Sequence, residues 1–227
     1  MCIRDSIGIV MDIVKTLTAA MQEADRVRER SVQVEIGASS IGGCRRQAWH
    51  IINKTPKTNF DTEILSSTMG TAIHEIIAKA LKLSDPFDDY LIEEEFKNDK
   101  ILGHCDFYSQ SAKLVADWKT VTLGKLAKNR IPTHQQKIQV NIYASLIAEK
   151  YPVERVALVF IPRDGRMRDI VAWEDQYRPE LAQEGFDWLA QVQAMDSPPP
   201  PEKPAAFFCR DYCSYYDESG VIGCQGK

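Results

Sequence analysis

The chain has 227 residues, enough for one sizeable domain with its own core. Its hydrophobic share of 44% and charged share of 26% are those of an ordinary water-soluble protein. The net charge of -4 at pH 7 excludes a protein that is basic throughout, so any nucleic-acid site must be locally basic. The chain contains neither an apolar run near the ~20 residues of a membrane span nor a patterned signal peptide. We therefore expect an intracellular, cytoplasmic protein without a membrane partner.

Helices are expected at the beginning of the chain. Residues 11–30 are amphipathic and charged and contain neither Gly nor Pro, which favours a helix. A small, flexible, glycine-containing loop at 37–43 precedes a short helix at 44–50. A longer helix is predicted over 67–82, where apolar residues recur at the spacing of one helix face.

The order of the later elements predicts a mixed sheet. These elements are strands at 91–96, 101–109 and 113–120, a helix at 135–149, strands at 155–161 and 167–173, and a helix at 180–195. Turn-like breaks separate the first three strands, which indicates antiparallel hairpins. The helix between the third and fourth strands predicts a parallel crossover. We expect an α/β protein with a mixed central sheet flanked by helices.

Three parts are expected along the chain. Residues 1–36 form an N-terminal helical segment, and residues 37–196 form the core domain. Residues 197–227 begin with the stiff run Ser-Pro-Pro-Pro-Pro and continue as a cysteine-rich tail, which we expect to pack on the core through Cys44.

Two neighbouring strands carry charged residues. Asp117 and Lys119 project to the same side of one strand, because successive residues alternate between its faces. Asp106 lies on the preceding strand after Gly103, a residue that lets a backbone or a ligand come close. A charged pair on an otherwise apolar strand is costly unless it binds something. Asp106 and Asp117, with the main-chain carbonyl of Trp118, would suit one or two hard divalent cations.

This set of groups suits the hydrolysis of a phosphodiester. A divalent cation would lower the pKa of a bound water and neutralise charge on the phosphate. Lys119 would orient that water or stabilise the transition state. The alternative interpretation is an ordinary surface salt bridge between Asp117 and Lys119, since such tripeptides are common.

Several nearby residues add to this pattern. His74 lies beside the apolar stripe of its helix, where alone it would be a boundary or core histidine. Gln139 and Tyr143 share one helix face at i, i+4. The run 93–95 consists of three glutamates, of which Glu95 is the best candidate to approach a metal, although a solvated strand edge is the simpler interpretation.

Basic residues gather where acidic ones are missing. The stretch 118–148 contains no acidic residue. Besides Lys119, it carries four candidate DNA contacts: Lys125, Lys128, Arg130 and Lys137. In an acidic protein this imbalance indicates either a track for phosphates or a solvated helix face and loop.

The ordered set of motifs resembles the RecB-like nucleases of the PD-(D/E)XK superfamily. The matches are His74 in Gly-Thr-Ala-Ile-His-Glu, Gly103-x-x-Asp106, Asp117-x-Lys119 and Gln139-x-x-x-Tyr143. The resemblance implies a restriction-endonuclease-like core and DNA cleavage that depends on Mg²⁺ or Mn²⁺. It assigns metal binding to His74, Asp106 and Asp117, catalysis to Lys119, and support of the site or DNA contact to Gln139 and Tyr143. Many relatives have Glu where this chain has Asp117, and both residues can ligate a metal.

The cysteines are unevenly distributed. In a reducing compartment, six cysteines with three crowded near the C-terminus favour a metal or an iron–sulphur cluster over disulfides. Cys209 and Cys213 share a face if their segment is helical, and Cys224 can return to them through a glycine-containing loop. Cys44 is the best candidate for a fourth ligand, because a helix N-terminus favours its thiolate. Cys105 is expected to be a small buried residue facing away from the acidic site.

Four thiolates suit either zinc or a [4Fe–4S] cluster. A subset of RecB-like nucleases, including AddB-like helicase–nucleases and CRISPR-associated iron–sulphur exonucleases, has one cysteine before the core and three after it. This resemblance implies a structural [4Fe–4S] cluster that pins the C-terminus to the N-terminal helix. The gap between Cys213 and Cys224 is longer than is usual in those relatives, so zinc stays the alternative.

The expected function is therefore that of a DNA exonuclease acting on single strands or DNA ends. Its setting would be recombination or repair, phage DNA processing or CRISPR adaptation. The alternative is a non-catalytic DNA-binding or scaffolding module that retains the nuclease fold and a structural metal cluster. The sequence leaves open an oligomer or an association with other recombination or adaptation proteins.

Overall fold

The computed structural model describes residues 12–27, 36–97, 101–128, 131–201 and 206–226. The chain divides into two compact units, Met1–Gln33 and Val34–Lys227. The first unit holds helix α1 (Ile13–Val27), which lies within the predicted helix at 11–30. The Asp12 side chain accepts a hydrogen bond from the backbone N–H of Lys15 at 3.1 Å, as a residue at a helix N-terminus does.

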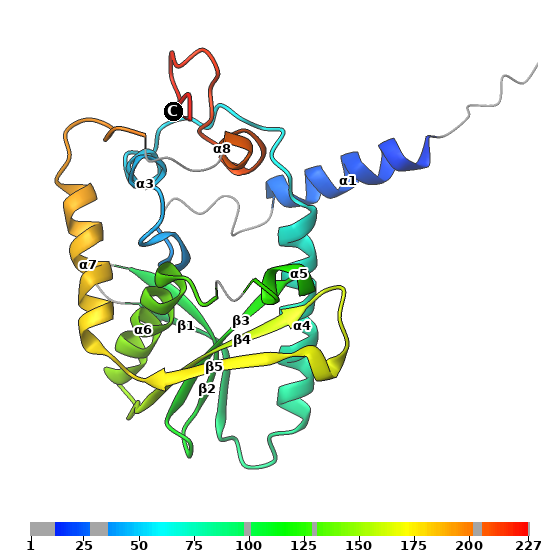
Figure 1. The fold of residues 1–227 in the computed structure, drawn as a ribbon, viewed down its shortest axis with the longest axis vertical. Helices are drawn as coiled ribbons and strands as arrows, with labels where there is room; N and C mark the ends of the chain where they lie inside the picture. The colour runs from blue at the N-terminus through cyan, green and yellow to red at the C-terminus, as the bar shows by residue number, and fades with distance from the viewer. Residues whose placement is uncertain (1–11, 28–35, 98–100, 129–130, 202–205, 227) are drawn as a thin grey trace, which may run out of the picture. The chain divides into compact units, whose positions relative to one another are not determined.

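The second unit is built on a five-stranded sheet (Figure 1). Its strands are β1 (Tyr90–Lys97), β2 (Leu102–Ser109), β3 (Leu114–Val121), β4 (Arg155–Pro162) and β5 (Val171–Gln176). They lie side by side in chain order; β3 and β4 are parallel and every other pair is antiparallel. The predicted hairpins, the parallel crossover and the mixed α/β fold class are confirmed.

Helices flank this sheet (Figure 1). Among the described residues of this unit, the helical elements are η1 (Ala38–Ser40), α3 (Arg45–Ile52), α4 (Leu65–Leu83), α5 (Leu123–Leu126), α6 (His134–Ala148), η2 (Met167–Asp169), α7 (Pro179–Gln193) and α8 (Ala206–Tyr212). Helix α4 packs against β1 and β3, whereas α6 packs against β1 to β4 and is covered by α7. The site residues on α4 and α6 are therefore held against the sheet by two different layers.

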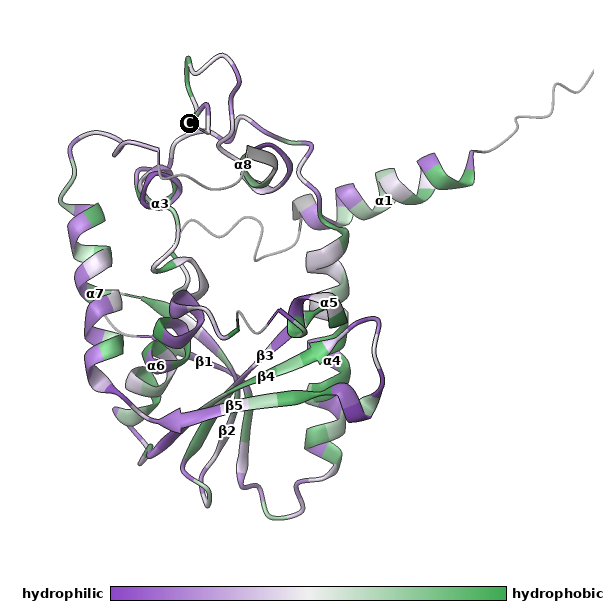
Figure 2. Cartoon of the chain, in the orientation of Figure 1, coloured by the Kyte–Doolittle hydropathy of each residue, from purple (hydrophilic) through white to green (hydrophobic). Residues whose placement is uncertain are grey.

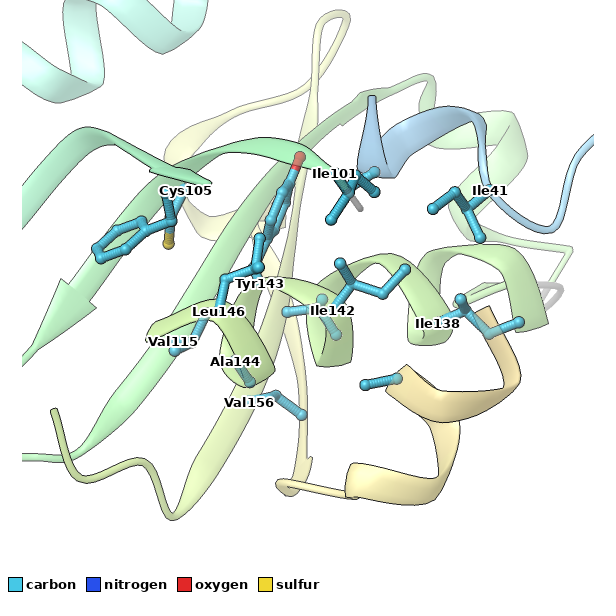
Figure 3. Close-up of a cluster of buried hydrophobic side chains, with 14 of the residues drawn as sticks. Ile41, Ile101, Cys105, Val115, Ile138, Ile142, Tyr143, Ala144, Leu146 and Val156 are labelled. Atoms are coloured by element: carbon cyan, nitrogen blue, oxygen red, sulfur yellow. The ribbon is translucent and has the colours of Figure 1, made fainter. Parts of the chain in front are cut away.

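Helix α6 is the most buried helix of the core. Val140, Ile142 and Ala144 are fully buried, and Figure 3 shows Ile138, Ile142 and Tyr143 among the core side chains. Burial runs without a break from Ile138 to Ala144 and so includes every face of the helix, although Gln139 and Asn141 within this run are polar. The start of the helix is fixed by a capping box in which Thr133 and Gln136 satisfy each other's backbone N–H groups. Strand β4, which the helix covers, is apolar along most of its length in Figure 2.

Two elements differ from the sequence prediction. The strand expected at 167–173 begins only at Val171, because a 3-10 turn forms first. The carboxylate of Asp169 accepts the backbone N–H of Arg166 at 2.8 Å, and such a local bond competes with strand pairing. The short helix α5 was not predicted; its first residue, Leu123, donates its N–H to Asp164 across 41 positions of sequence.

The C-terminal tail is hydrogen-bonded to the segment that follows α3. The backbone N–H groups of Thr58 and Asn59 both donate to the carbonyl of Ser214. The Asn59 side chain donates to the carbonyls of Arg210 and Cys213, at 2.7 and 3.1 Å. The predicted boundaries of the three parts of the chain stay predictions. No helix in the described segments is both long enough and apolar enough to cross a membrane.

Candidate functional site

The two predicted carboxylates meet where β2 and β3 separate. Phe107 of β2 pairs with Ala116 of β3, and Asp106 and Asp117 come next on their strands. Instead of a backbone bond, the Asp106 side chain accepts the backbone N–H of Trp118 at 2.7 Å. Both carboxylates are buried, with 6% and 2% of Asp106 and Asp117 exposed. From α4, the Nδ1 atom of His74 lies 3.2 Å from Asp106 Oδ1.

The other predicted residues form one hydrogen-bonded chain with Asp117. The Lys119 ammonium lies 2.6 Å from Asp117 Oδ2 and donates to Gln139 Oε1 at 2.9 Å. The amide of Gln139 donates to Asp117 Oδ1 at 3.1 Å and to the Tyr143 hydroxyl at 3.0 Å. The i, i+4 pair on α6 therefore fixes the carboxylate and the lysine on β3.

Gly103 allows α6 to come this close to the sheet. A Cβ atom at Gly103 would lie 2.9 Å from the Tyr143 ring and 3.2 Å from Leu146. Real Cβ atoms essentially never come as close as 2.9 Å to another atom, and 3.2 Å is a tight contact, so a side chain at position 103 would force Tyr143 to move.

Burial and neighbouring charge perturb the titration of this site. Burial raises the pKa of Asp117 to about 6; the Asp106 carboxylate adds to this rise, and the Lys119 ammonium opposes it. The hydrogen bond to Asp106 raises the pKa of His74, against the effect of burial. Burial also raises the pKa of Tyr143, which keeps its hydroxyl neutral. Two adjacent buried carboxylates are expensive unless a cation offsets their charge.

A third acidic residue joins this site. One ligand atom each of His74, Glu93 and Asp106 lie within 4.8 Å of one another. Carboxylate oxygens suit Mg²⁺ and Mn²⁺, and an imidazole nitrogen is compatible with Mn²⁺. These residue types therefore fit a divalent cation.

The sequence favours Glu95 as the glutamate nearest a metal, but it is Glu93 that lies with His74 and Asp106 in the candidate metal-binding group. Glu95 instead lies 3.3 Å from His104, in an exposed pair. Residues two apart should share a strand face, so alternation alone could not separate these two glutamates. The backbone of Glu93 has a φ of 55°, a left-handed conformation that is costly for a residue with a side chain and that breaks the alternation.

The predicted DNA contacts are divided between surface and packed positions. Lys125 and Lys128 are exposed, and Arg130 lies outside the described residues. The Lys137 ammonium lies 5.1 Å from the centre of the Trp173 ring, a cation–π contact. Contact of these four residues with DNA, and ligation of a metal by the carbonyl of Trp118, stay predictions.

The four predicted cysteine ligands line one small cavity. Cys44 precedes the first residue of α3, Cys209 lies in α8, and Cys213 and Cys224 follow in the tail. All four are free thiols. Burial raises the pKa of Cys213 to about 11, with the neighbouring cysteines adding to the rise. Separately, Cys105 is packed in the hydrophobic core, as Figure 3 shows.

Two further residues of this cavity have no signal in the sequence. Gly226 has a φ of 71° and donates its N–H to Cys224 Sγ at 3.3 Å, and a Cβ at this position would lie only 2.9 Å from the Cβ of Cys209. His50 also lines the cavity and is 2% exposed. Four thiols with a backbone donor and a close glycine are a donor set that fits a metal centre.

Comparison with known proteins gives likenesses of fold. No protein-family model and no curated protein matches the chain. The crystal structure of SSO0001 superposes with a TM-score of 0.53 at 17% identity, over 95% of this chain and 97% of that one. A phage-related exonuclease from Haemophilus somnus 129PT has a TM-score of 0.46 at 18% identity, over 77% and 84% of the two chains. The alkaline exonuclease LHK-Exo of Laribacter hongkongensis has a TM-score of 0.46 at 11% identity, over 77% and 93%.

Proposed function

We propose that this chain is a deoxyribonuclease that depends on Mg²⁺ or Mn²⁺ and acts as an exonuclease on single strands or DNA ends. One observation carries the proposal: four separate elements bring the acidic residues, the lysine and their supports into one buried, hydrogen-bonded site. The connected residues are His74, Asp106, Asp117, Lys119, Gln139 and Tyr143. A surface salt bridge between Asp117 and Lys119 would need neither the burial nor Gln139.

The acidic side of the site would hold the cation through His74, Glu93, Asp106 and Asp117. When bound, the cation supplies charge neutralisation at the phosphate and lowers the pKa of water. The chain's own contribution begins with Asp117, whose buried carboxylate has a raised pKa. Its ionised form, and with it a high affinity for cations, is favoured when positive charge is close.

Lys119 is the residue that would meet the phosphate. Of the three N–H donors of its ammonium, one bonds Gln139 Oε1, and a second faces Asp117 Oδ2, with which the ammonium forms an ion pair at 2.6 Å. The third can donate to a phosphate oxygen and stabilise the charge that develops as water adds to phosphorus and the P–O bond breaks. Gln139 holds Lys119 and Asp117 in one geometry, so neither must reorganise during the reaction.

The cysteine centre would be a structural [4Fe–4S] cluster held by Cys44, Cys209, Cys213 and Cys224. The four thiols line one cavity, as ligands of a shared centre must, and a tetrahedral zinc site held by the same four cysteines is the alternative. The cluster would close a loop of most of the chain and hold the tail on the segment after α3.

Nucleotide release from labelled DNA tests the enzymatic proposal. Single and double strands labelled at the 5′ or 3′ end are incubated with Mg²⁺ or Mn²⁺, which reports activity, polarity and mode together. We expect Lys119→Ala to lower the rate by at least about 10²-fold. Lys113→Ala is the matched control, because Lys113 pairs with Glu154 at the surface. Wild type and Lys119→Ala that are equally inert would leave a binding or scaffolding module as the better interpretation.

A further inference from the structure

His50 lines the four-cysteine cavity as a buried histidine whose ring nitrogens lack hydrogen-bond partners among the described residues. It stands six residues after Cys44 on α3, and its ring stacks on Tyr215 with centroids 5.2 Å apart. The side chain is 2% exposed. Within the described part of the chain, neither of its ring nitrogens has a hydrogen-bond partner.

A buried imidazole needs an acceptor whichever tautomer it adopts. Burial, assisted by the positive charge of Arg46, lowers the pKa of His50, so the ring is neutral and carries one N–H donor. Buried donors are nearly always satisfied, and packing against Tyr215 and Trp49 would be served equally well by a phenyl ring. The surface that His50 shares with the cavity offers sulphur atoms as acceptors.

We propose that His50 donates its ring N–H to a sulphur of the metal centre held by the four cysteines, and that it tunes the reduction potential of that centre. The inference rests on the proposed [4Fe–4S] cluster. Hydrogen bonds to the sulphurs of a cluster stabilise its more negative, reduced state and raise its potential. His50 is thus a positioning and tuning residue rather than a ligand, and it would act beside the N–H of Gly226, which already reaches Cys224 Sγ.

The test uses the full chain, purified without oxygen and labelled with ¹⁵N only in histidine. The chain has four histidines, and among the described residues His50 is the one that lines the four-cysteine cavity, so a weak ¹⁵N coupling in the pulsed EPR spectrum of the reduced cluster is expected to come from His50. We expect His50→Phe to lose this coupling and to lower the midpoint potential. We expect His50→Asn or His50→Gln, which keep a donor, to restore the potential. His134→Gln is the control, because His134 is exposed and paired with Glu184.

Either of two results would overturn the role of His50: no ¹⁵N coupling in the wild type, or a potential in His50→Phe equal to that of the wild type. The measurement of ¹⁵N coupling uses only the wild type, so it can overturn the proposal even if His50→Phe does not fold. Wild-type protein that contains zinc and no iron would overturn the cluster and this inference with it. The DNA-cleavage assay with Lys119→Ala would be unaffected, so the two failures are distinguishable.

Discussion

At the scale of single residues, Gln139 is the support of the proposed site. Its side chain is buried and uses both the oxygen and the nitrogen of its amide, on Lys119, Asp117 and Tyr143. We expect Gln139→Ala to release Lys119 and to lower the single-turnover rate of nucleotide release by about 10²-fold. Gln183→Ala is the control, because Gln183 bonds Asp187 on the exposed face of α7. A rate unchanged in Gln139→Ala would contradict a supporting role.

Glu93 and Glu95 make a matched pair for testing the metal group. We expect Glu93→Gln to raise the Mn²⁺ concentration needed for half-maximal activity by about 10-fold, because one carboxylate of the group is neutralised. Glu95→Gln should leave this concentration unchanged, because Glu95 lies beside His104. A titration of activity against Mn²⁺ measures both. Equal shifts in the two variants would mean that the effect is one of general surface charge.

At the scale of elements, the site depends on how closely α6 approaches β2. We expect Gly103→Ala to push Tyr143 and Leu146 away and to destabilise the fold by about 1–3 kcal/mol, as overpacking does. Gly124→Ala is the control, since a Cβ at Gly124 meets nothing within 4 Å. Urea unfolding measures both, and nucleotide release should fall with Gly103→Ala. If Gly103→Ala and Gly124→Ala had equal free energies of unfolding, α6 would be able to move away from β2 without loss of stability.

How far the sequence predicts the site is also decided at this scale. Strand alternation correctly predicts that Asp117 and Lys119 share a side, and helix periodicity correctly pairs Gln139 with Tyr143. Alternation fails at Glu93, because one residue in a left-handed conformation turns its side chain toward α4. The approach of His50 to the cysteines depends on contacts between α3 and the tail, which no local pattern encodes.

At the scale of the whole molecule, one carboxylate organises the loop that returns Cys224 to the other cysteines. The Asp217 side chain accepts hydrogen bonds from the Ser219 hydroxyl and from the backbone N–H groups of Ser219, Ile222 and Gly223. These bonds, that from the Ser219 hydroxyl foremost, hold the pKa of Asp217 well below its usual value. Because the pKa is lowered in the folded state, the stabilisation is complete above about pH 4.

This stabilisation should be lost progressively as the pH falls below about 4, toward the folded-state pKa of Asp217. We expect Asp217→Asn to lower the melting temperature at pH 7. Between pH 4 and pH 2, the melting temperature of the variant should fall less than that of the wild type. The variant should also lose metal from the cysteine centre faster when exposed to a chelator. Glu218→Gln is the control, because the Glu218 side chain is adjacent to Asp217 in sequence and makes none of these loop hydrogen bonds. An identical acid response in wild type and Asp217→Asn would refute this account.

The Asp106 side chain has two roles: it completes the sheet, and it belongs to the proposed metal site. Asp106 supplies the acceptor that Trp118 would otherwise find in a neighbouring strand, at the place where β2 and β3 part. Asp106→Ala would therefore remove two things at once: the acceptor for the Trp118 N–H and the negative charge of the carboxylate. Asparagine can still accept the Trp118 N–H while removing the negative charge, so Asp106→Asn is the substitution that separates architecture from reactivity.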